Sequence, residues 1–139
     1  SRAPVLVIEK SYIANSGGSG EFRGGLGQRI RIRKLHDDRR TTMVSIYPEG
    51  VGNPVTGLFG GEAGCEASGR VLNSNGDILA DCGTGSLVEL ETPDKIVELV
   101  LAGGSGYGDP AARALHRAEH DHAEGIAPQP LDHGRRQSA

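Results

Sequence analysis

Residues 16–27 read SGGSGEFRGGLG, and six of these twelve residues are glycine. Glycine adopts backbone conformations that other residues avoid and lets another chain come close, but it loses the most entropy when it is ordered. A flexible linker would have no reason to hold Phe22, Arg23 and Leu26 at fixed places between its glycines. The stretch therefore predicts a shaped loop, anchored by Phe22 and Leu26, on which the first strands turn.

The same pattern occurs twice more, as GLFGGEAG at 57–64 and GGSGYGDP at 103–110, where Tyr107 is expected to be a further anchoring ring. Together the three blocks hold 14 of the 22 glycines, so glycine is concentrated at these positions rather than spread along the chain. Their composition predicts tight turns. A phosphate cradle is the alternative, since converging backbone amides bind anions, but the blocks match neither a P-loop nor a dinucleotide fingerprint.

These three blocks, in this order, resemble the C-terminal part of the hydantoinase B family, and the resemblance runs from about residue 5 to residue 125. That family includes N-methylhydantoinase, 5-oxoprolinase and subunits of the acetone and acetophenone carboxylases. Its chains are typically much longer, so the resemblance implies either a fragment or a gene split in which the tail is a separate small subunit. An acetophenone carboxylase-like complex, which includes a subunit of about this size, is the favoured relative.

The resemblance implies a non-catalytic small subunit of a multisubunit ATP-dependent carboxylase, which completes and bridges larger hydantoinase A-like and B-like subunits. ATP and a divalent cation would then bind on those partner subunits, and no catalytic, cofactor-binding or metal-binding residue is assigned to this chain. Two alternatives stay open. One is a C-terminal fragment of an ATP-dependent hydantoinase or 5-oxoprolinase B chain, and the other is a free-standing β module that binds an anion.

The composition limits the folds that the chain can adopt and the partners that it can bind. A chain of 139 residues fits one domain, but 36% hydrophobic residues with two Phe and no Trp predict a thin core that is completed against a partner. The net charge of −3 gives no general attraction to nucleic acid or to a membrane surface, and no apolar run is long enough to span a membrane. Two cysteines without closely spaced pairs favour a cytoplasmic protein with reduced thiols.

The spacing of apolar and turn residues predicts a mainly β fold, a glycine-rich sandwich or barrel of about six or seven short strands. The expected strands lie at 4–13, 28–35, 41–47, 86–90 and 95–101, with a hairpin over 69–81. Asn75-Gly76 marks the hairpin turn, because both residues tolerate positive φ. Met43, Val44, Ile46 and Tyr47 are the candidates for burial in the third strand.

The last part of the chain has a different character. Asp109 suits a helix N-cap, Pro110 the first helical position and Gly125 the residue after the helix, so a helix is predicted over 111–124. Its weak apolar stripe consists of Ala111, Ala114, Leu115 and Ala118. We therefore expect a glycine-rich β domain at 1–108, a C-terminal helix at 109–125, and an extended arm or disordered tail at 126–139.

An arginine face is the first group of residues that suggests binding. Arg29, Arg31 and Arg33 alternate with isoleucines in one strand, and Lys34 follows them, so together they can grip an anion or an acidic partner. Aromatic residues that would stack on nucleic acid are not interleaved with them. A solvated or partner-facing sheet surface is therefore favoured.

Four residues are candidate metal ligands. They are Cys65, Cys82, His116 and His120, with Asp121 and His122 next to the second histidine. A structural zinc site normally contains closely paired cysteines, so surface histidines and buried thiols are the favoured interpretation. Ser105 stands between glycines but not in a nucleophile elbow, and it is expected to lie in a turn.

Overall fold

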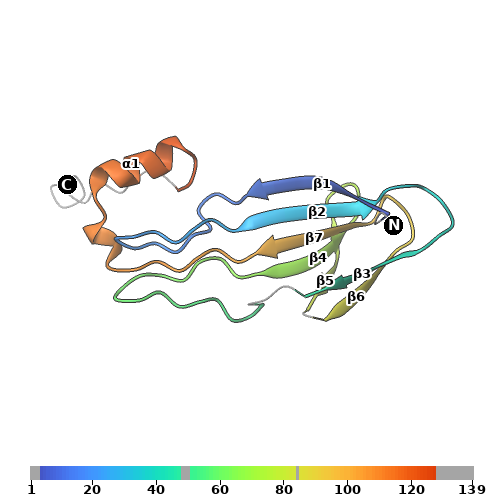
Figure 1. The fold of residues 1–139 in the computed structure, drawn as a ribbon, viewed down its shortest axis with the longest axis horizontal. Helices are drawn as coiled ribbons and strands as arrows, with labels where there is room; N and C mark the ends of the chain where they lie inside the picture. Colours follow the sequence, from blue (N-terminus) through green and yellow to red (C-terminus); the bar gives the residue numbers. More distant parts are fainter. Residues whose placement is uncertain (1–3, 48–50, 84, 128–139) are drawn as a thin grey trace.

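The structure is a computed structural model that describes residues 4–47, 51–83 and 85–127. Over these ranges seven antiparallel strands form two sheets, and an α-helix follows them (Figure 1). The strands are β1 (Val5–Tyr12), β2 (Gln28–Lys34), β3 (Thr42–Ile46), β4 (Ser68–Leu72), β5 (Ile78–Cys82), β6 (Ser86–Leu90) and β7 (Ile96–Leu101). A 3-10 turn, η1 (Pro110–Ala112), precedes α1 (Leu115–Ala123). The prediction of a mainly β fold with a C-terminal helix is confirmed.

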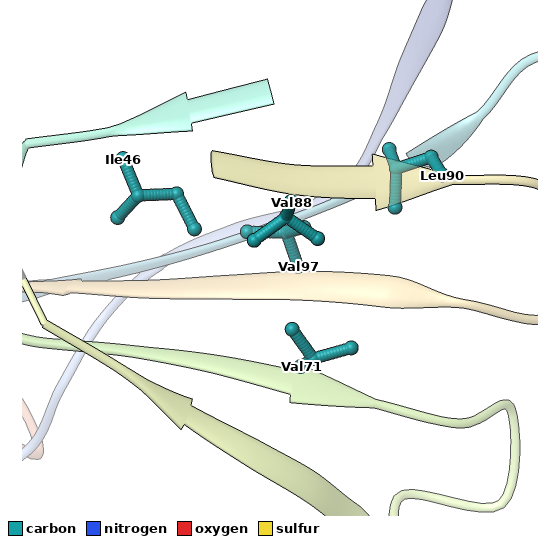
Figure 2. Packing of buried hydrophobic residues seen from close by; sticks show 5 residues of the cluster. All are labelled: Ile46, Val71, Val88, Leu90 and Val97. Carbon is teal, nitrogen blue, oxygen red and sulfur yellow. The ribbon is translucent and has the colours of Figure 1, made fainter. Parts of the chain in front are cut away.

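The two sheets form a small sandwich. The larger sheet has the order β1-β2-β7-β4-β5, and β3 pairs with β6 in the second sheet. Figure 2 shows Ile46, Val88 and Leu90 of the small sheet facing Val71 and Val97 of the large one. Because β1 and β5 are edge strands that pair on one side only, the sheet does not close into a barrel.

The apolar core is confined to the contact between the two sheets. Ile46, Leu90 and Val97 are almost fully buried there. Many other large apolar side chains of the described residues are exposed, among them Leu6, Val7 and Ile8 on β1, Ile78 and Leu79 on β5, and Met43 and Tyr47 on and after β3. The prediction that Met43 and Tyr47 are buried is wrong, because the small sheet has only one covered face.

A row of alternating charges crosses the other face of the large sheet, with one residue from each strand. In register it runs Glu9, Arg31, Glu98, Arg70 and Asp81. Glu98 on the central strand β7 is 6% exposed. Its Oε2 accepts a hydrogen bond from Arg31 Nε at 2.8 Å and forms an ion pair with a terminal nitrogen of the same guanidinium group at 2.7 Å. The long arginine side chains therefore cover a carboxylate on a face that has no second sheet over it.

The C-terminal helix starts four residues later than predicted, at Leu115 instead of 111. Asp109 caps η1 as expected, since its Oδ1 accepts a hydrogen bond from the Ala111 amide at 2.9 Å, but Arg113 then returns to extended backbone. Gly125 follows the helix with a φ of 69°, as expected for the residue that ends it. The predicted apolar stripe is wrong, because Leu115 is 63% exposed while the buried helix residue is Asp121.

Most of the arm predicted at 126–139 lies outside the described residues. The division of the chain into three parts, with boundaries after residues 108 and 125, stays a prediction. The part that is described ends in Ala127, which is buried. No helix in the described part of the chain has the length and apolar character needed to cross a membrane.

Candidate functional site

The three glycine blocks lie side by side beyond one end of the large sheet, as extended segments (Figure 1). We call residues 16–27, 57–65 and 103–108 the glycine bundle. Its segments are joined by backbone hydrogen bonds. The Gly18 amide donates to the Gly104 oxygen, and the Gly106 amide donates to the Glu62 oxygen, each at 2.8 Å. Segments that are far apart in the sequence thus form one body without being strands of the main sheet.

Glycine is required in the bundle because neighbouring backbones pass where a Cβ atom would stand. A methyl group on Gly24 would overlap the carbonyl group of Gly104, and one on Gly106 would overlap the Ser19 carbonyl. On Gly20 it would stand 2.8 Å from backbone atoms of Phe22 and Tyr107, closer than real Cβ contacts come.

The prediction that the glycine blocks are tight turns is therefore wrong for most of their length. Among their glycines only Gly60 and Gly108 have positive φ, at 91° and 81°. The other glycines serve close approach between segments, which the composition of each block alone does not distinguish from a turn. Ser105 likewise lies in the extended segment 103–108 and not in a turn.

The far end of the bundle carries a cluster of exposed apolar side chains. We call Phe22, Leu58, Phe59 and Tyr107 the apolar tip; all four are exposed, Phe59 most of all at 78%. Tyr107 and Phe22 exchange two backbone hydrogen bonds of 2.9 Å, and the ring centroid of Tyr107 lies 5.3 Å from that of Phe59. Phe22 and Tyr107, the predicted anchoring rings, are thus both exposed, and they join their two segments through the backbone.

Phe59 is held in a conformation that a side-chain-bearing residue rarely adopts. Its φ is 50°, and it is followed by Gly60 at 91°. The turn is closed by a hydrogen bond from the Gly61 amide to the Leu58 oxygen at 3.0 Å. Such a left-handed residue costs about 1–3 kcal/mol and persists where the surroundings fix it, often at a functional position.

Helix α1 is attached to the bundle by charge. Asp121, 6% exposed, accepts hydrogen bonds from Arg113 Nε and ion-pairs with its terminal nitrogen, both at 2.9 Å. Arg23 Nε lies 3.4 Å from the same carboxylate oxygen. The two arginines also bind the bundle backbone, because Arg113 donates to the Glu21 oxygen at 2.9 Å and Arg23 to the Gly17 oxygen at 3.2 Å. We call Arg23, Arg113 and Asp121 the arginine–aspartate clamp.

Replacing Asp121 by Ala is expected to release α1 from the bundle while the sandwich stays folded. The change leaves two mostly buried guanidinium groups without their shared carboxylate, and hydrogen bonds to charged groups contribute about 1.5–3 kcal/mol. Amide hydrogen exchange over 115–123 should therefore accelerate by about tenfold or more. Glu119→Ala, an exposed acid on the same helix, is the matched control. Unchanged exchange in Asp121→Ala would show that other contacts hold the helix.

The candidate metal ligands are not brought together. Cys65 lies in the glycine bundle, where its amide donates to the Ser16 oxygen at 2.7 Å, whereas Cys82 is on edge strand β5. His116 and His120 are exposed on α1. Across the ranges that the structure describes, no three His, Cys, Asp or Glu side chains are placed to hold a metal ion. Both thiols are free, and burial raises the pKa of Cys82.

The arginine face is largely engaged within the sheet. Arg31 binds Glu98 and lies 3.8 Å from Glu9, and Arg29 lies 3.7 Å from Glu98. Arg33 donates to the backbone oxygen of Lys34 at 2.9 Å. Alternation places these arginines on one side as predicted, but cross-strand acids neutralise two of them. Arg29 and Arg31 therefore already face acids of this chain where an external anion would have to bind.

Lys34 does not belong to the arginine face. Alternation along β2 places it on the opposite side, where it is 2% exposed. Its Nζ lies 2.6 Å from Asp38 Oδ1 and also donates to the backbone oxygens of Asp38 and Glu91, at 2.7 and 3.3 Å. The hydrogen bond from the Lys34 ammonium holds the pKa of Asp38 below its usual value. Lys34 therefore links β2 to the loop that follows it through a buried ammonium group.

An open hollow of about 720 Å³ lies between the end of β1, the bundle and the last turn of α1. Tyr12, Leu26 and Ile126 give it a largely apolar wall, and His120 and Glu124 add an imidazole and a carboxylate. Leu26, predicted as an anchor, is half-buried in this wall. The hollow offers a surface for contact rather than a recognisable set of catalytic groups. The expectation that this chain carries no catalytic residue stays a prediction.

Comparison with known proteins finds relatives of this chain among larger proteins. Residues 1–110 match the family described as Hydantoinase B/oxoprolinase. Caprolactamase subunit beta of Pseudomonas jessenii is 33% identical over 114 residues, and 5-oxoprolinase of Dictyostelium discoideum is 34% identical over 107. The crystal structure of the ATP-dependent caprolactamase from Pseudomonas jessenii matches 95% of this chain with a TM-score of 0.67 at 26% identity. A nucleotide-free acetone carboxylase matches 91% with a TM-score of 0.60 at 19% identity, which shows a shared fold alone.

The chain spans only a small part of each of these proteins. The aligned region covers 81% of this chain but 19% of caprolactamase subunit beta, and 77% of this chain but 8% of the 5-oxoprolinase. In the two solved structures it corresponds to 22% and 20% of the matching chain. In each relative the shared fold is therefore one region of a much larger protein.

Proposed function

The chain belongs to the hydantoinase B/oxoprolinase family, and we propose that it is a non-catalytic structural part of a multisubunit, ATP-dependent enzyme. In this role it completes and bridges larger hydantoinase A-like and B-like subunits. ATP and a divalent cation bind on those larger subunits, and the reaction takes place there.

The observation that carries this proposal is the imbalance between buried and exposed apolar side chains. The core is a single layer between two small sheets, while the edge strand β1, the edge strand β5 and the apolar tip all expose large apolar groups. Contiguous exposed apolar surface on a folded protein usually marks a contact with another protein. A chain of this family with so much unsatisfied apolar area is suited to a place inside a larger assembly.

Sequence identity supports cyclic-amide hydrolysis as the reaction of that assembly. The relatives aligned at 33% and 34% identity are named caprolactamase and 5-oxoprolinase, after a lactam and a cyclic amino acid amide. In such an assembly, ATP hydrolysis drives the opening of an amide ring that is otherwise slow to hydrolyse.

The second candidate is an ATP-dependent carboxylase resembling acetophenone carboxylase, in which this chain is the small subunit. It is supported by the fold shared with acetone carboxylase. The reaction would then be the carboxylation of an aromatic ketone by bicarbonate. The two candidates share the structural role of this chain and differ in the substrate of its partners.

The test is coexpression of the chain with the hydantoinase A-like and B-like subunits of the same organism. Native mass spectrometry should show one complex that contains all three, and its ATP hydrolysis should rise with 5-oxoproline or caprolactam in the first case, or with acetophenone and bicarbonate in the second. A chain that stays a stable monomer beside an assembled and active pair of larger subunits would contradict the proposed role.

A further inference from the structure

We infer that the apolar tip is the anchor by which the glycine bundle inserts into an apolar pocket on the larger B-like subunit. This inference rests on the proposed function, which supplies the partner. It goes beyond that function by naming the surface that makes the contact and the chemistry of the site that receives it.

The composition of the tip matches that of an interface anchor. The whole chain has two Phe and three Tyr, and three of these five rings are at the tip. Binding energy at protein interfaces concentrates in a few aromatic and arginine side chains that enter pockets on the partner. In a chain so poor in aromatic residues, three exposed rings at the end of a projecting body are costly to keep in water.

The tip is also rigidly presented. Phe22, Leu58 and Tyr107 come from the three segments of the bundle, and isolated β-bridges join Tyr107 to each of the other two. Phe59 stands beyond them on a left-handed turn, with its ring packed edge-on against Tyr107. A side chain that is fixed before binding loses less entropy when it is buried, so this arrangement favours association.

The charges beside the tip define the rim of the receiving pocket. The guanidinium group of the exposed Arg117 lies 5.5 Å from the centre of the Phe22 ring. Asp109 lies next to Gly60, and Glu21 lies next to Gly108. A complementary partner therefore has an apolar pocket with a carboxylate that faces Arg117 and a basic group that faces Asp109, which fixes the orientation of the bundle.

The B-like subunit is favoured over a second copy of this chain as the occupant. In caprolactamase the shared fold is 22% of one chain, so the remainder of that chain is available to cover the tip. A contact between two tips would set exposed rings against exposed rings and would offer neither tip a pocket to enter. A larger partner with a pocket of its own can enclose the rings.

The experiment compares affinities of variants for the coexpressed larger subunits. Phe59→Ala should raise Kd by about tenfold or more, equivalent to about 1.4 kcal/mol. Tyr47→Ala, another exposed aromatic residue but on the sandwich, is the matched control and should change Kd by less than about twofold. Arg117→Glu should also raise Kd, because it replaces the cation that faces the partner's carboxylate by an anion.

A photoreactive benzophenone side chain at position 59 provides a second readout that does not depend on how a truncated variant folds. Peptide mapping should place its cross-link in the B-like subunit. A complex that forms with unchanged affinity in Phe59→Ala, or a cross-link to a second copy of this chain, would overturn the tip as the anchor and leave the proposed function standing. Failure of the wild-type chain to form any complex would overturn both.

Discussion

Gly24→Ala is expected to destroy the glycine bundle, whereas Gly25→Ala, one residue along, is expected to be tolerated. A methyl group on Gly24 would overlap the carbonyl group of Gly104. Neither the methyl group nor the carbonyl group can move aside unless its own backbone shifts. Relief requires the two segments to separate, which breaks the hydrogen bonds that flank the contact. Overpacking of this kind costs about 3 kcal/mol or more when no flexible side chain can move aside.

Gly25 provides a control that differs in position by a single residue. A Cβ atom there would meet nothing within 4 Å, and its φ is not in the left-handed region. Because alanine restricts the unfolded chain more than glycine does, Gly25→Ala should be neutral or stabilising by up to about 1 kcal/mol. Urea unfolding of both variants checks the pair. Equal stability of the two would mean that the bundle does not pack as closely as the structure shows.

Glu98→Gln is expected to cause a large loss of stability for a change on the face of the sheet that carries the charges. Glu98 is 6% exposed, and its carboxylate forms an ion pair with Arg31 at 2.7 Å and lies 3.7 Å from Arg29. Removing its charge leaves these guanidinium groups without a counter-ion on the central strand. Breaking a fully buried pair costs about 3–5 kcal/mol, and because Arg31 is partly in contact with water we expect about 2–3 kcal/mol here.

The matched control for Glu98→Gln is Asp81→Asn, at the end of the same row of charges. Asp81 is exposed on the edge strand and lies 3.4 Å from Arg70. Pairs of this kind contribute between zero and about 1 kcal/mol, so Asp81→Asn should shift the urea midpoint little. A midpoint shift in Glu98→Gln no larger than that of Asp81→Asn would show that the row is not a source of stability.

Local patterns in the sequence were enough to predict the elements of the sandwich. Alternation along β2 and the Asn75-Gly76 turn between β4 and β5 located strands within one or two residues of their observed ends. Only Gly76 of that pair takes a positive φ, because the Asn73 side chain closes the turn by accepting bonds from the Asn75 and Asp77 amides. Such features depend on neighbours along the chain, which the sequence displays directly.

Two of the features that were missed depend on segments far apart in the sequence. That β7 lies between β2 and β4, and that Gly24 packs on Gly104, follow from contacts between distant regions that no local pattern records. The docking of α1 was missed for a different reason. A search for an apolar stripe finds Leu115, whereas the helix is attached through the buried carboxylate of Asp121. In the sequence, nothing distinguishes Asp121 from an ordinary surface acid.

The joining of residues 18, 62 and 104 within one bundle has a consequence for the order in which the molecule matures. Closing loops of such length costs entropy before any contact is gained, and the glycines add to that cost. During synthesis on the ribosome the first block can bond with the second through the amides of Glu62 and Cys65, but the bundle stays incomplete until the third block has left the exit tunnel. The bundle, like the large sheet that needs β7, therefore closes late in folding, and the nascent chain is most open to a chaperone, or to the partner itself, in the interval before it closes.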